Sequence, residues 1–289
     1  MPLLSRRALL RTGAAATIAG VAAVAALETG AVPGRAKVHD VLGLSGPDGV
    51  VPDVPPGPVE SGTFESAARR TTVGYSVVRP YGSSAELPVV LALHGRGGDH
   101  TSAIGDLGMD RYLTAAMRSG TPPFAVATVD GGRDNYWHPR ATGDDPLRML
   151  SAEFLPLLAK RGLRTDRVGV LGWSMGGYGA LLWGGRSAVA IGAMSPALWR
   201  RYDDVADGAF DGADDFERHQ VFGHPPENVA VRIDCGRDDP FAGAAGDLRR
   251  ELHAAGGQQA GAHTGGYWRR MLPEQLRFLG EKLTGTPPR

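Results

Sequence analysis

The stretch Val168-Gly-Val-Leu-Gly172-Trp-Ser174-Met-Gly176-Gly-Tyr-Gly-Ala180 decides the fold. A short apolar run ends in Gly-x-Ser-x-Gly, and small and apolar residues that can begin a helix follow at once. This order predicts a strand, a sharp turn and a helix, with the Ser174 hydroxyl exposed at the end of a sheet, an arrangement called a nucleophile elbow. Because such a turn is tight, we expect that a side chain at Gly172 or Gly176 would collide with the neighbouring strand or helix.

Apolar runs and segments of helical spacing alternate on both sides of the elbow. The predicted strands are residues 71–79, 88–93, 124–129, 168–171, 188–194 and 229–233. The predicted helices are residues 106–118, 145–161, 177–185, 244–255 and 273–283. This alternation predicts an α/β fold, a mainly parallel sheet with helices on both faces, with the first strand antiparallel and near the sheet's edge. In such sheets, functional residues gather at the carboxyl ends of the strands.

A serine hydroxyl becomes a strong nucleophile only when a base takes its proton and a carboxylate orients that base. In folds with this elbow, the order along the chain is serine, acid, histidine, which leaves His219, His224, His253 and His263 as candidate bases. His263 lies in a loop just before the last predicted helix, and we predict it as the base. The other three are interpreted as surface residues.

The acid should follow the late strand at residues 229–233, where three carboxylates compete. Asp234 is assigned to the end of the strand itself. The spacing Gly-x-x-Asp places Asp239 on the turn beyond the strand, and Pro240 then stiffens the loop. We predict Asp239 as the acid, with Asp238 as the alternative.

An oxyanion requires backbone N–H donors that already point at it. One predicted donor is the amide of Met175, directly after the serine. The other is the amide of Arg96 in the glycine-rich loop His94–Asp99, which follows a buried strand. His94 is expected to support this loop.

The composition narrows the classes of partner. Thirty-one Lys and Arg balance 31 Asp and Glu, so no net charge indicates nucleic acid or an anionic membrane as a partner. The single cysteine, Cys235, excludes an intrachain disulfide and is expected to be buried. The acidic residues between 203 and 217 lack the spacing of a calcium loop and are interpreted as a solvated, partly helical segment. We expect no metal and no cofactor.

The amino-terminal part of the chain is interpreted as an export signal followed by a linker. The segment Ser5–Leu10 contains a twin-arginine pattern, and an Ala/Gly-rich run of signal-peptide length follows it. We therefore expect a twin-arginine signal at residues 1–31, a Pro/Gly-rich linker at 32–60 and a catalytic domain at 61–289. Export by this route would leave the protein secreted or associated with the cell envelope, with no stable membrane span once the signal is removed.

Taken together, several motifs between residues 71 and 283 resemble the esterase family that includes S-formylglutathione hydrolase (esterase D) and the antigen 85 mycolyltransferases. The similarity is greatest to exported actinobacterial esterases. The motifs are LHGRGGD (93–99), DGGRDNYWHPR (130–140), GWSMGGYGA (172–180), MSPALW (194–199), DCGRDDPF (234–241) and HTGGYWRRMLPEQLRFL (263–279).

The resemblance implies an α/β-hydrolase fold with a Ser–Asp–His triad and no cofactor. The triad falls on Ser174, Asp239 and His263, and the oxyanion donors fall on the amides of Arg96 and Met175. Candidate walls of the substrate pocket are His94, Tyr136, Trp137, His138 and Trp199, although core packing explains such aromatic residues equally well. Esterase D carries cysteine-containing motifs near its oxyanion loop and antigen 85 has a glutamate as its acid. Because both features differ here, neither a glutathione thioester nor mycolyl transfer is implied directly.

The sequence therefore predicts a serine hydrolase that cleaves carboxylic esters through an acyl-enzyme on Ser174, acting on a small-molecule, lipid or carbohydrate ester. Two alternatives stay open. One is an acyltransferase of the mycolyltransferase type, which passes the acyl group to a sugar or glycerol alcohol. The other is a non-catalytic binding protein of the cell envelope. Residues 197–228 are expected to form an insertion that covers part of the site, and neither the acyl group nor the oligomeric state is predicted.

Overall fold

The computed structural model describes residues 35–83 and 86–284. The chain divides into two compact units, residues 1–46 and residues 47–289. In the first unit the structure describes a helix, α2 (Arg35–Val41). The predicted twin-arginine segment, residues 1–31, lies outside the described residues. None of the described helices is both long enough and apolar enough to span a membrane.

The second unit is built on one sheet in which eight strands are described, in the order β1-β2-β4-β3-β5-β6-β7-β8. Strands β1 and β2 are antiparallel to their neighbours, and all pairs from β4 to β8 are parallel. The predicted mainly parallel α/β sheet is therefore confirmed. The strands are β1 (Val59–Ser66), β2 (Thr71–Val78), β3 (Pro88–Leu93), β4 (Ala125–Val129), β5 (Arg164–Trp173), β6 (Ala190–Met194), β7 (Ala230–Gly236) and β8 (Ala255–Gln259).

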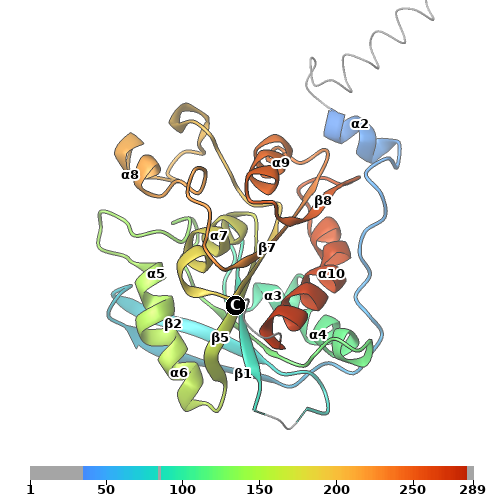
Figure 1. The fold of residues 1–289 in the computed structure, drawn as a ribbon, viewed down its shortest axis with the longest axis vertical. Helices are drawn as coiled ribbons and strands as arrows, with labels where there is room; N and C mark the ends of the chain where they lie inside the picture. Colours follow the sequence, from blue (N-terminus) through green and yellow to red (C-terminus); the bar gives the residue numbers. More distant parts are fainter. Residues whose placement is uncertain (1–34, 84–85, 285–289) are drawn as a thin grey trace, which may run out of the picture. The chain divides into compact units, whose positions relative to one another are not determined.

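Helices cover both faces of this sheet (Figure 1). One face carries α3 (Ser102–Gly105), α4 (Met109–Arg118) and α10 (Gly265–Thr284). The other face carries α5 (Pro146–Met149), the π-helical turn η1 (Leu150–Phe154), α6 (Leu155–Lys160), α7 (Met175–Ser187) and α9 (Ala242–Glu251). The short 3₁₀-helix η2 (Tyr202–Asp204) and the helix α8 (Ala213–Arg218) belong to the segment between β6 and β7.

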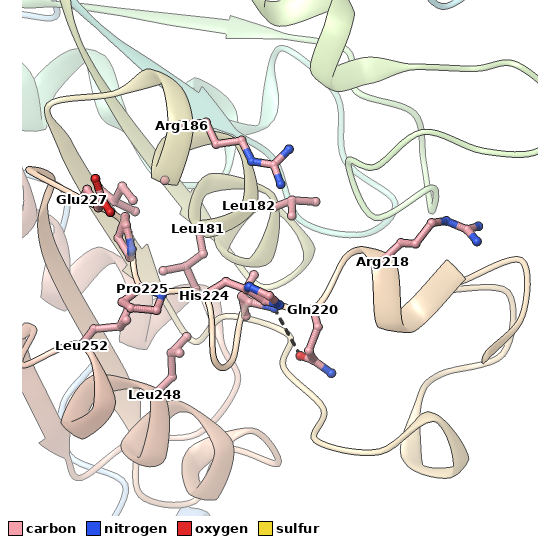
Figure 2. A pocket seen from close by; sticks show the side chains of 14 residues that line it. Leu181, Leu182, Arg186, Arg218, Gln220, His224, Pro225, Glu227, Leu248 and Leu252 are labelled. Carbon is pink, nitrogen blue, oxygen red and sulfur yellow. Dashed lines mark hydrogen bonds between the residues drawn. The ribbon is translucent and has the colours of Figure 1, made fainter. Parts of the chain in front are cut away.

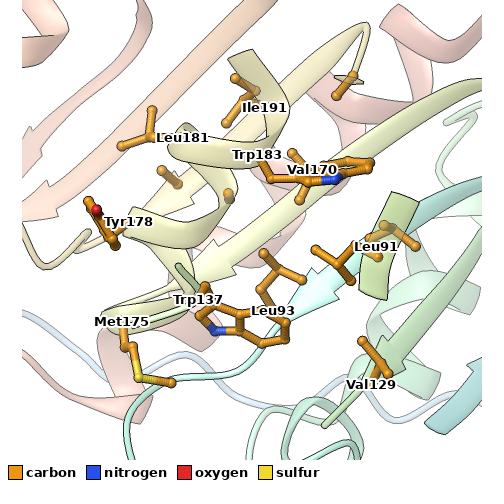
Figure 3. Packing of buried hydrophobic residues seen from close by; sticks show 14 of the residues in the cluster. Leu91, Leu93, Val129, Trp137, Val170, Met175, Tyr178, Leu181, Trp183 and Ile191 are labelled. Atoms are coloured by element: carbon orange, nitrogen blue, oxygen red, sulfur yellow. The ribbon is translucent and has the colours of Figure 1, made fainter. Parts of the chain in front are cut away.

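Two hydrophobic cores, one on each face, hold the strands in place. Along β3, Leu91 and Leu93 belong to one core while Val90 belongs to the other, as expected for alternating side chains of a strand buried on both faces. Figure 3 shows the first core, where Leu93 and Val170 lie beneath the helix that follows the elbow. Burial of each such side chain contributes roughly 1.5–3 kcal/mol, so the carboxyl ends of β3 and β5 are firmly positioned.

Several element boundaries differ from the sequence prediction. Strand β8 has the composition AGGQQ, without the β-branched residues that mark a strand, and it is held by parallel pairing with β7. Helix α10 begins at Gly265 and continues through Pro273, which the sequence predicted as its start. Residues before the proline, such as Met271 and Leu272, are buried against the sheet, so packing outweighs the hydrogen bond that the proline removes.

The segment predicted as a linker also differs from expectation. Its first part contains α2. Its second part, residues 47–58, belongs to the second unit and lies against two of that unit's helices as an ordered strap. The Gly49 amide donates to the carbonyl of Gly266 at 2.8 Å, and the Tyr112 hydroxyl donates to the carbonyl of Val50 at 2.8 Å. The strap is therefore attached both to the start of α10 and to α4. Prolines favour an extended backbone here, as the composition indicates, and that backbone finds its partners on these two helices.

Candidate active site

Ser174 forms the turn between β5, which ends at Trp173, and α7, which begins at Met175. Its backbone has φ 55° and ψ −122°, a conformation that residues other than glycine rarely adopt. A Cβ built on Gly172 would overlap the carbonyl oxygen of Gly176, and one built on Gly176 would overlap the backbone of β3. Glycine at both positions thus permits the close approach that the turn requires.

The structure brings the predicted nucleophile, base and acid together. Ser174 Oγ lies 2.8 Å from His263 Nε2, and His263 Nδ1 lies 2.8 Å from Asp239 Oδ2. Asp238, the alternative acid, is adjacent in sequence, but its amide donates to the carbonyl of Gly261 at 2.9 Å. Of the two carboxylates, Asp239 is the one that contacts the histidine.

Both partners of the serine are held in place by their surroundings. The Asp239 side chain is fully buried, and its second oxygen, Oδ1, accepts a hydrogen bond from the Phe241 amide at 2.9 Å. The imidazole of His263 meets the rings of Phe241 and Trp268 edge to face, with centroid distances of 5.5 and 5.1 Å. Because these contacts restrict the ring, Nε2 stays directed at the serine.

Two backbone amides lie beside the serine as candidate oxyanion donors. Met175 is the first residue of α7, so its N–H has no partner within the helix and lies at the positive end of the helix dipole. In the loop after β3, the Gly97 amide donates to the Arg133 carbonyl and the Gly98 amide donates to the Gly95 carbonyl. The amide of Arg96, the residue just before Gly97, donates to no group among the residues that the structure describes.

His94 supports this loop from beneath. It is buried, with Nδ1 2.9 Å from the Gly95 carbonyl, and its Nε2 accepts the Gly131 amide at 3.0 Å. A carbonyl can only accept, so Nδ1 carries the proton and the ring is neutral. The Trp137 indole donates to the carbonyl of His94 at 3.1 Å. The predicted supporting role of His94 is consistent with these bonds.

A hollow of about 630 Å³ opens in front of Ser174. Aromatic side chains and the glycine-rich loop account for most of its walls. It is lined by Gly95, Arg96, Gly97, Gly98, Ser102, Asp106, Tyr136, Trp173, Ser174, Ala197, Trp199, Ala206, Phe241, His263 and Trp268. Trp199 and Ala206 come from residues 197–228, so this insertion supplies part of one wall, as expected.

The hollow corrects part of the predicted pocket. Tyr136 and Trp199 line it, but His94, Trp137 and His138 do not. Trp137 and His138 are fully buried in the protein interior, and burial lowers the pKa of His138. Trp173, Phe241 and Trp268 also line the hollow but were not predicted as walls. All three lie in the quoted motifs, but a motif does not show which aromatic side chains face the substrate.

Other candidate residues fall outside this site. His224 and His253 are exposed, as predicted, whereas His219 is half-buried beside Asp215, contrary to the prediction. Asp215 is buried too, although the acidic segment was expected to be solvated. Cys235 is buried, as expected, and burial raises the pKa of its thiol.

A second hollow, of about 450 Å³, lies beside α7 and α9 (Figure 2). Leu181 and Leu248 contribute to its apolar floor, and Arg186 and Arg218 lie around it. It shares no lining residue with the hollow in front of Ser174. Because Ser174 lines only the first of these two hollows, we expect the substrate to bind there.

Comparison with known proteins agrees with this geometry. A family model described as "Putative esterase" matches residues 66–279, more than two thirds of the chain. No curated protein matches. Among solved structures, a ferulic acid esterase has 21% identity and a TM-score of 0.69, with 78% of this chain and 99% of that chain covered.

Two further structures are similar at comparable coverage. A fluorophosphonate-binding serine hydrolase from Staphylococcus aureus has 17% identity and a TM-score of 0.61, with 78% of this chain and 99% of that chain covered. An S-formylglutathione hydrolase from Agrobacterium tumefaciens has 15% identity and a TM-score of 0.63, with 78% and 96% covered. At these identities the structural likeness confirms the α/β-hydrolase fold.

Proposed function

Because this chain belongs to the esterase family, and is a serine esterase acting on carboxylic esters, we propose that Ser174, Asp239 and His263 are its catalytic triad. The observation that carries the assignment is the pair of 2.8 Å contacts that joins Ser174 Oγ, the two ring nitrogens of His263 and Asp239 Oδ2. This chain of contacts is what proton transfer from a serine requires.

In the first half of the reaction, His263 Nε2 takes the proton of Ser174 while Oγ attacks the ester carbonyl carbon. The carbonyl oxygen becomes an oxyanion, to which the amides of Arg96 and Met175 donate. Each such donor is worth about 3–4 kcal/mol in the transition state. The imidazolium then gives its proton to the leaving alcohol, and the acyl group stays on Ser174.

In the second half, water replaces the alcohol. His263 takes a proton from the water, which attacks the acyl carbon, and the same amides hold the new oxyanion. The proton then returns to Ser174 Oγ as the carboxylic acid leaves. Throughout, the Asp239 carboxylate keeps the Nδ1 proton in place and stabilises the cationic ring.

The principal experiment removes the nucleophile. Ser174→Ala should lower kcat for a short p-nitrophenyl ester by about 10⁴-fold or more, and it should abolish labelling by a fluorophosphonate probe. Ser187→Ala is the matched control, because Ser187 is exposed at the other end of α7. Wild-type hydrolysis by Ser174→Ala, or labelling of another residue, would overturn the assignment.

For the substrate, we propose esters whose acyl group is a flat aromatic acid. The support is the ring of aromatic walls in front of Ser174, which includes Tyr136, Trp199 and Phe241. Several structurally similar proteins are ferulic acid esterases. An aromatic acyl group could stack or pack edge to face against these rings.

The substrate proposal is tested with methyl ferulate and methyl butyrate as a matched pair. We expect the wild type to prefer the aromatic ester in kcat/KM, and Trp199→Ala to reduce that preference by about tenfold by raising KM, since a lost aromatic contact is worth about 1 kcal/mol or more. Equal losses for both esters would contradict it. Product analysis with added glycerol would reveal any acyl transfer to an alcohol.

We also propose that the protein is exported by the twin-arginine route. The support is the SRRALL segment and the Ala/Gly-rich run after it, together with a single cysteine, since this route carries folded chains that need no disulfide. Replacing Arg6 and Arg7 together by lysine should retain the protein in the cytoplasm of a host that has this route. Replacing Arg11 by lysine is the control and should leave export intact. Equal export of both variants would contradict the proposal.

A further inference from the structure

Three side chains that can ligate a metal meet away from the triad, where the loop after β4 contacts the insertion. His138 comes from that loop, and Asp215 and His219 come from α8 and the residue after it. One ligand atom from each can be chosen so that all lie within 4.8 Å of one another. His138 Nδ1 lies 3.6 Å from Asp215 Oδ2, and His219 Nδ1 lies 3.0 Å from Asp215 Oδ1.

Both ring nitrogens of the fully buried His138 face hydrogen-bond acceptors, but a neutral imidazole can donate from only one of them. Its Nε2 lies 2.8 Å from the carbonyl oxygen of Ala209, and its Nδ1 lies 3.0 Å from the carbonyl oxygen of Pro139. Carbonyl oxygens only accept, and a neutral imidazole has one N–H. If Nε2 donates along its shorter contact, the Nδ1 lone pair faces acceptors only, including the Asp215 carboxylate. A buried lone pair in that position is favourable only if it takes up a proton or binds a metal cation.

The same arrangement is common around protein metal ions. A ligating histidine usually donates its other ring N–H to a carbonyl or carboxylate, as Nε2 can do to Ala209 here. Ligands about 2.1 Å from a tetrahedral metal lie roughly 3.4 Å apart. Each histidine Nδ1 is at about that distance from one Asp215 oxygen, Oδ2 for His138 at 3.6 Å and Oδ1 for His219 at 3.0 Å. The widest separation, which is at most 4.8 Å, must contract by up to about 1.4 Å, and a movement of the half-buried His219 would provide this.

We propose that His138 Nδ1, Asp215 and His219 Nδ1 bind a divalent transition-metal ion of the Zn²⁺ type. Two imidazoles and one carboxylate suit Zn²⁺ rather than Ca²⁺ or Mg²⁺, which prefer oxygen ligands. His219 Nδ1 now lies 2.9 Å from the main-chain carbonyl of Asp215. On binding, the metal takes the place of the Nδ1 proton, and the ring carries its proton on Nε2 instead.

Such a metal would be structural rather than catalytic. None of the three ligands lines the hollow in front of Ser174. The cluster joins the loop that carries Tyr136 to the insertion that carries Trp199, two walls of that hollow. It is also attached to α7, because the Tyr178 hydroxyl donates to the His219 carbonyl at 2.8 Å. Metal binding would therefore hold the insertion against the body of the enzyme.

The test is metal binding by the full chain, with no ester present. Chelator-treated protein is titrated with ZnCl₂ by calorimetry, and thermal unfolding is followed with and without the metal. We expect one Zn²⁺ per chain and a higher Tm with Zn²⁺. His219→Gln and Asp215→Asn should weaken binding about 100-fold, whereas His224→Gln and His253→Gln, which change exposed histidines, should bind as the wild type does.

Two further measurements distinguish loss of the metal site from loss of folding in a variant. Circular dichroism shows whether each variant is folded, and Co²⁺ in place of Zn²⁺ should give a visible absorption band that His219→Gln loses. The proposal is overturned if the wild type binds no Zn²⁺. It is equally overturned if His219→Gln binds as tightly as the wild type, or if His224→Gln is the variant that loses binding. None of these outcomes depends on esterase activity.

Discussion

At the scale of single residues, neighbouring carboxylates have different surroundings. Asp239 is buried, with one oxygen on His263 and the other on the amide of Phe241. The adjacent Asp238 is half-buried, and its amide donates to the carbonyl of Gly261. A difference of one position in sequence thus separates the carboxylate that contacts His263 from a neighbour whose amide is hydrogen-bonded to the loop before His263.

This difference predicts unequal effects of two matched substitutions. Asp239→Asn should lower kcat by about 10³–10⁴-fold, because an amide can donate to Nδ1 and stabilise the wrong tautomer of His263. Asp238→Asn should change kcat by less than about tenfold. Steady-state kinetics on a p-nitrophenyl ester would check both values. If Asp238→Asn proved the more damaging change, the acid would have to be reassigned.

His94 makes the free energy of unfolding depend on pH. Burial lowers the pKa of this histidine, and its Nε2 accepts the amide of Gly131 and so cannot be protonated without breaking that bond. An unfolded chain has histidines of ordinary pKa, about 6.5, so it binds this proton more readily than the folded protein does. The contribution of neutral His94 to the free energy of unfolding is therefore fully present above about pH 6.5. It is lost as the pH falls through the lower pKa of His94 in the folded protein.

The expected result is a free energy of unfolding that decreases between pH 7 and 5, with His94 contributing at most about 1.4 kcal/mol per pH unit. His94→Gln should show a smaller decrease over that range, whatever its stability at pH 7. His253→Gln, which changes an exposed histidine, should keep the wild-type slope. Urea unfolding at several pH values measures the slopes, and identical slopes for wild type and His94→Gln would refute the explanation.

At the scale of elements, a buried carboxylate in β7 joins that strand to the neighbouring strand β8 and to helix α10, which packs on the sheet. Asp234 in β7 accepts hydrogen bonds from Arg232 Nε at 2.7 Å, from Gln275 of α10 at 2.9 Å and from the Gly257 amide of β8 at 3.2 Å. Asp234 and Gln275 are both fully buried. This network holds β8 and α10 against β7, and His263 lies in the loop between β8 and α10.

Asp234→Ala should lower the free energy of unfolding by about 3–5 kcal/mol, because it leaves the amide of Gln275 without its acceptor and removes from Arg232 the nearer of its two carboxylates. Arg232 then keeps only the longer contact with Glu274, at 3.7 Å. Glu281→Ala, on the exposed side of α10, should change it by less than about 0.5 kcal/mol. Denaturant unfolding would measure both. A loss of less than about 1 kcal/mol for Asp234→Ala would show that the network is not a major contributor.

The elements that the sequence predicted are those whose own residues determine them. The elbow was predictable because Gly172 and Gly176 are required by local geometry, and β3 because its apolar run is buried on both faces. Strand β8 was not predictable, since AGGQQ becomes a strand only through pairing with β7. The burial of His138 could not be predicted from the sequence either, because Ala209, which contacts its Nε2, is 71 positions away in the chain.

The candidate site follows the same rule. Ser174, Asp239 and His263 could be chosen from motif order, which reflects the positions of strand ends in the sheet. The walls of the hollow could not be chosen, because whether an aromatic residue faces the substrate or the core depends on how the insertion folds over the sheet. Trp137 and Trp199 looked alike in sequence, but only Trp199 lines the hollow.

At the scale of the whole molecule, the two compact units and the strap predict how much of the chain the enzyme needs. The proposed triad, the hollow and both hydrophobic cores lie in residues 47–289. A protein that begins at Pro47 should therefore keep the wild-type kcat/KM, with a Tm within about 2 °C of the full chain.

A protein that begins at Val59 lacks the strap and should be less stable. It loses the bonds of Gly49 and Val50 to α10 and α4, each worth about 0.5–1.5 kcal/mol. Calorimetry and ester kinetics on the two truncated proteins would test this. Equal Tm values for both would show that the strap is dispensable, and inactivity of the longer one would show that residues 1–46 contribute to the site.

The backbone at Ser174 has a consequence for how this enzyme could be used. Its φ of 55° is unfavourable for serine and favourable for glycine, so the nucleophile is held at a cost of about 1–3 kcal/mol in stability. Ser174→Gly would relax that strain and remove the chemistry while leaving the aromatic hollow unchanged. The result would be a receptor that is more stable than the enzyme and retains its uncleaved ester, suited to capturing the natural substrate from a mixture.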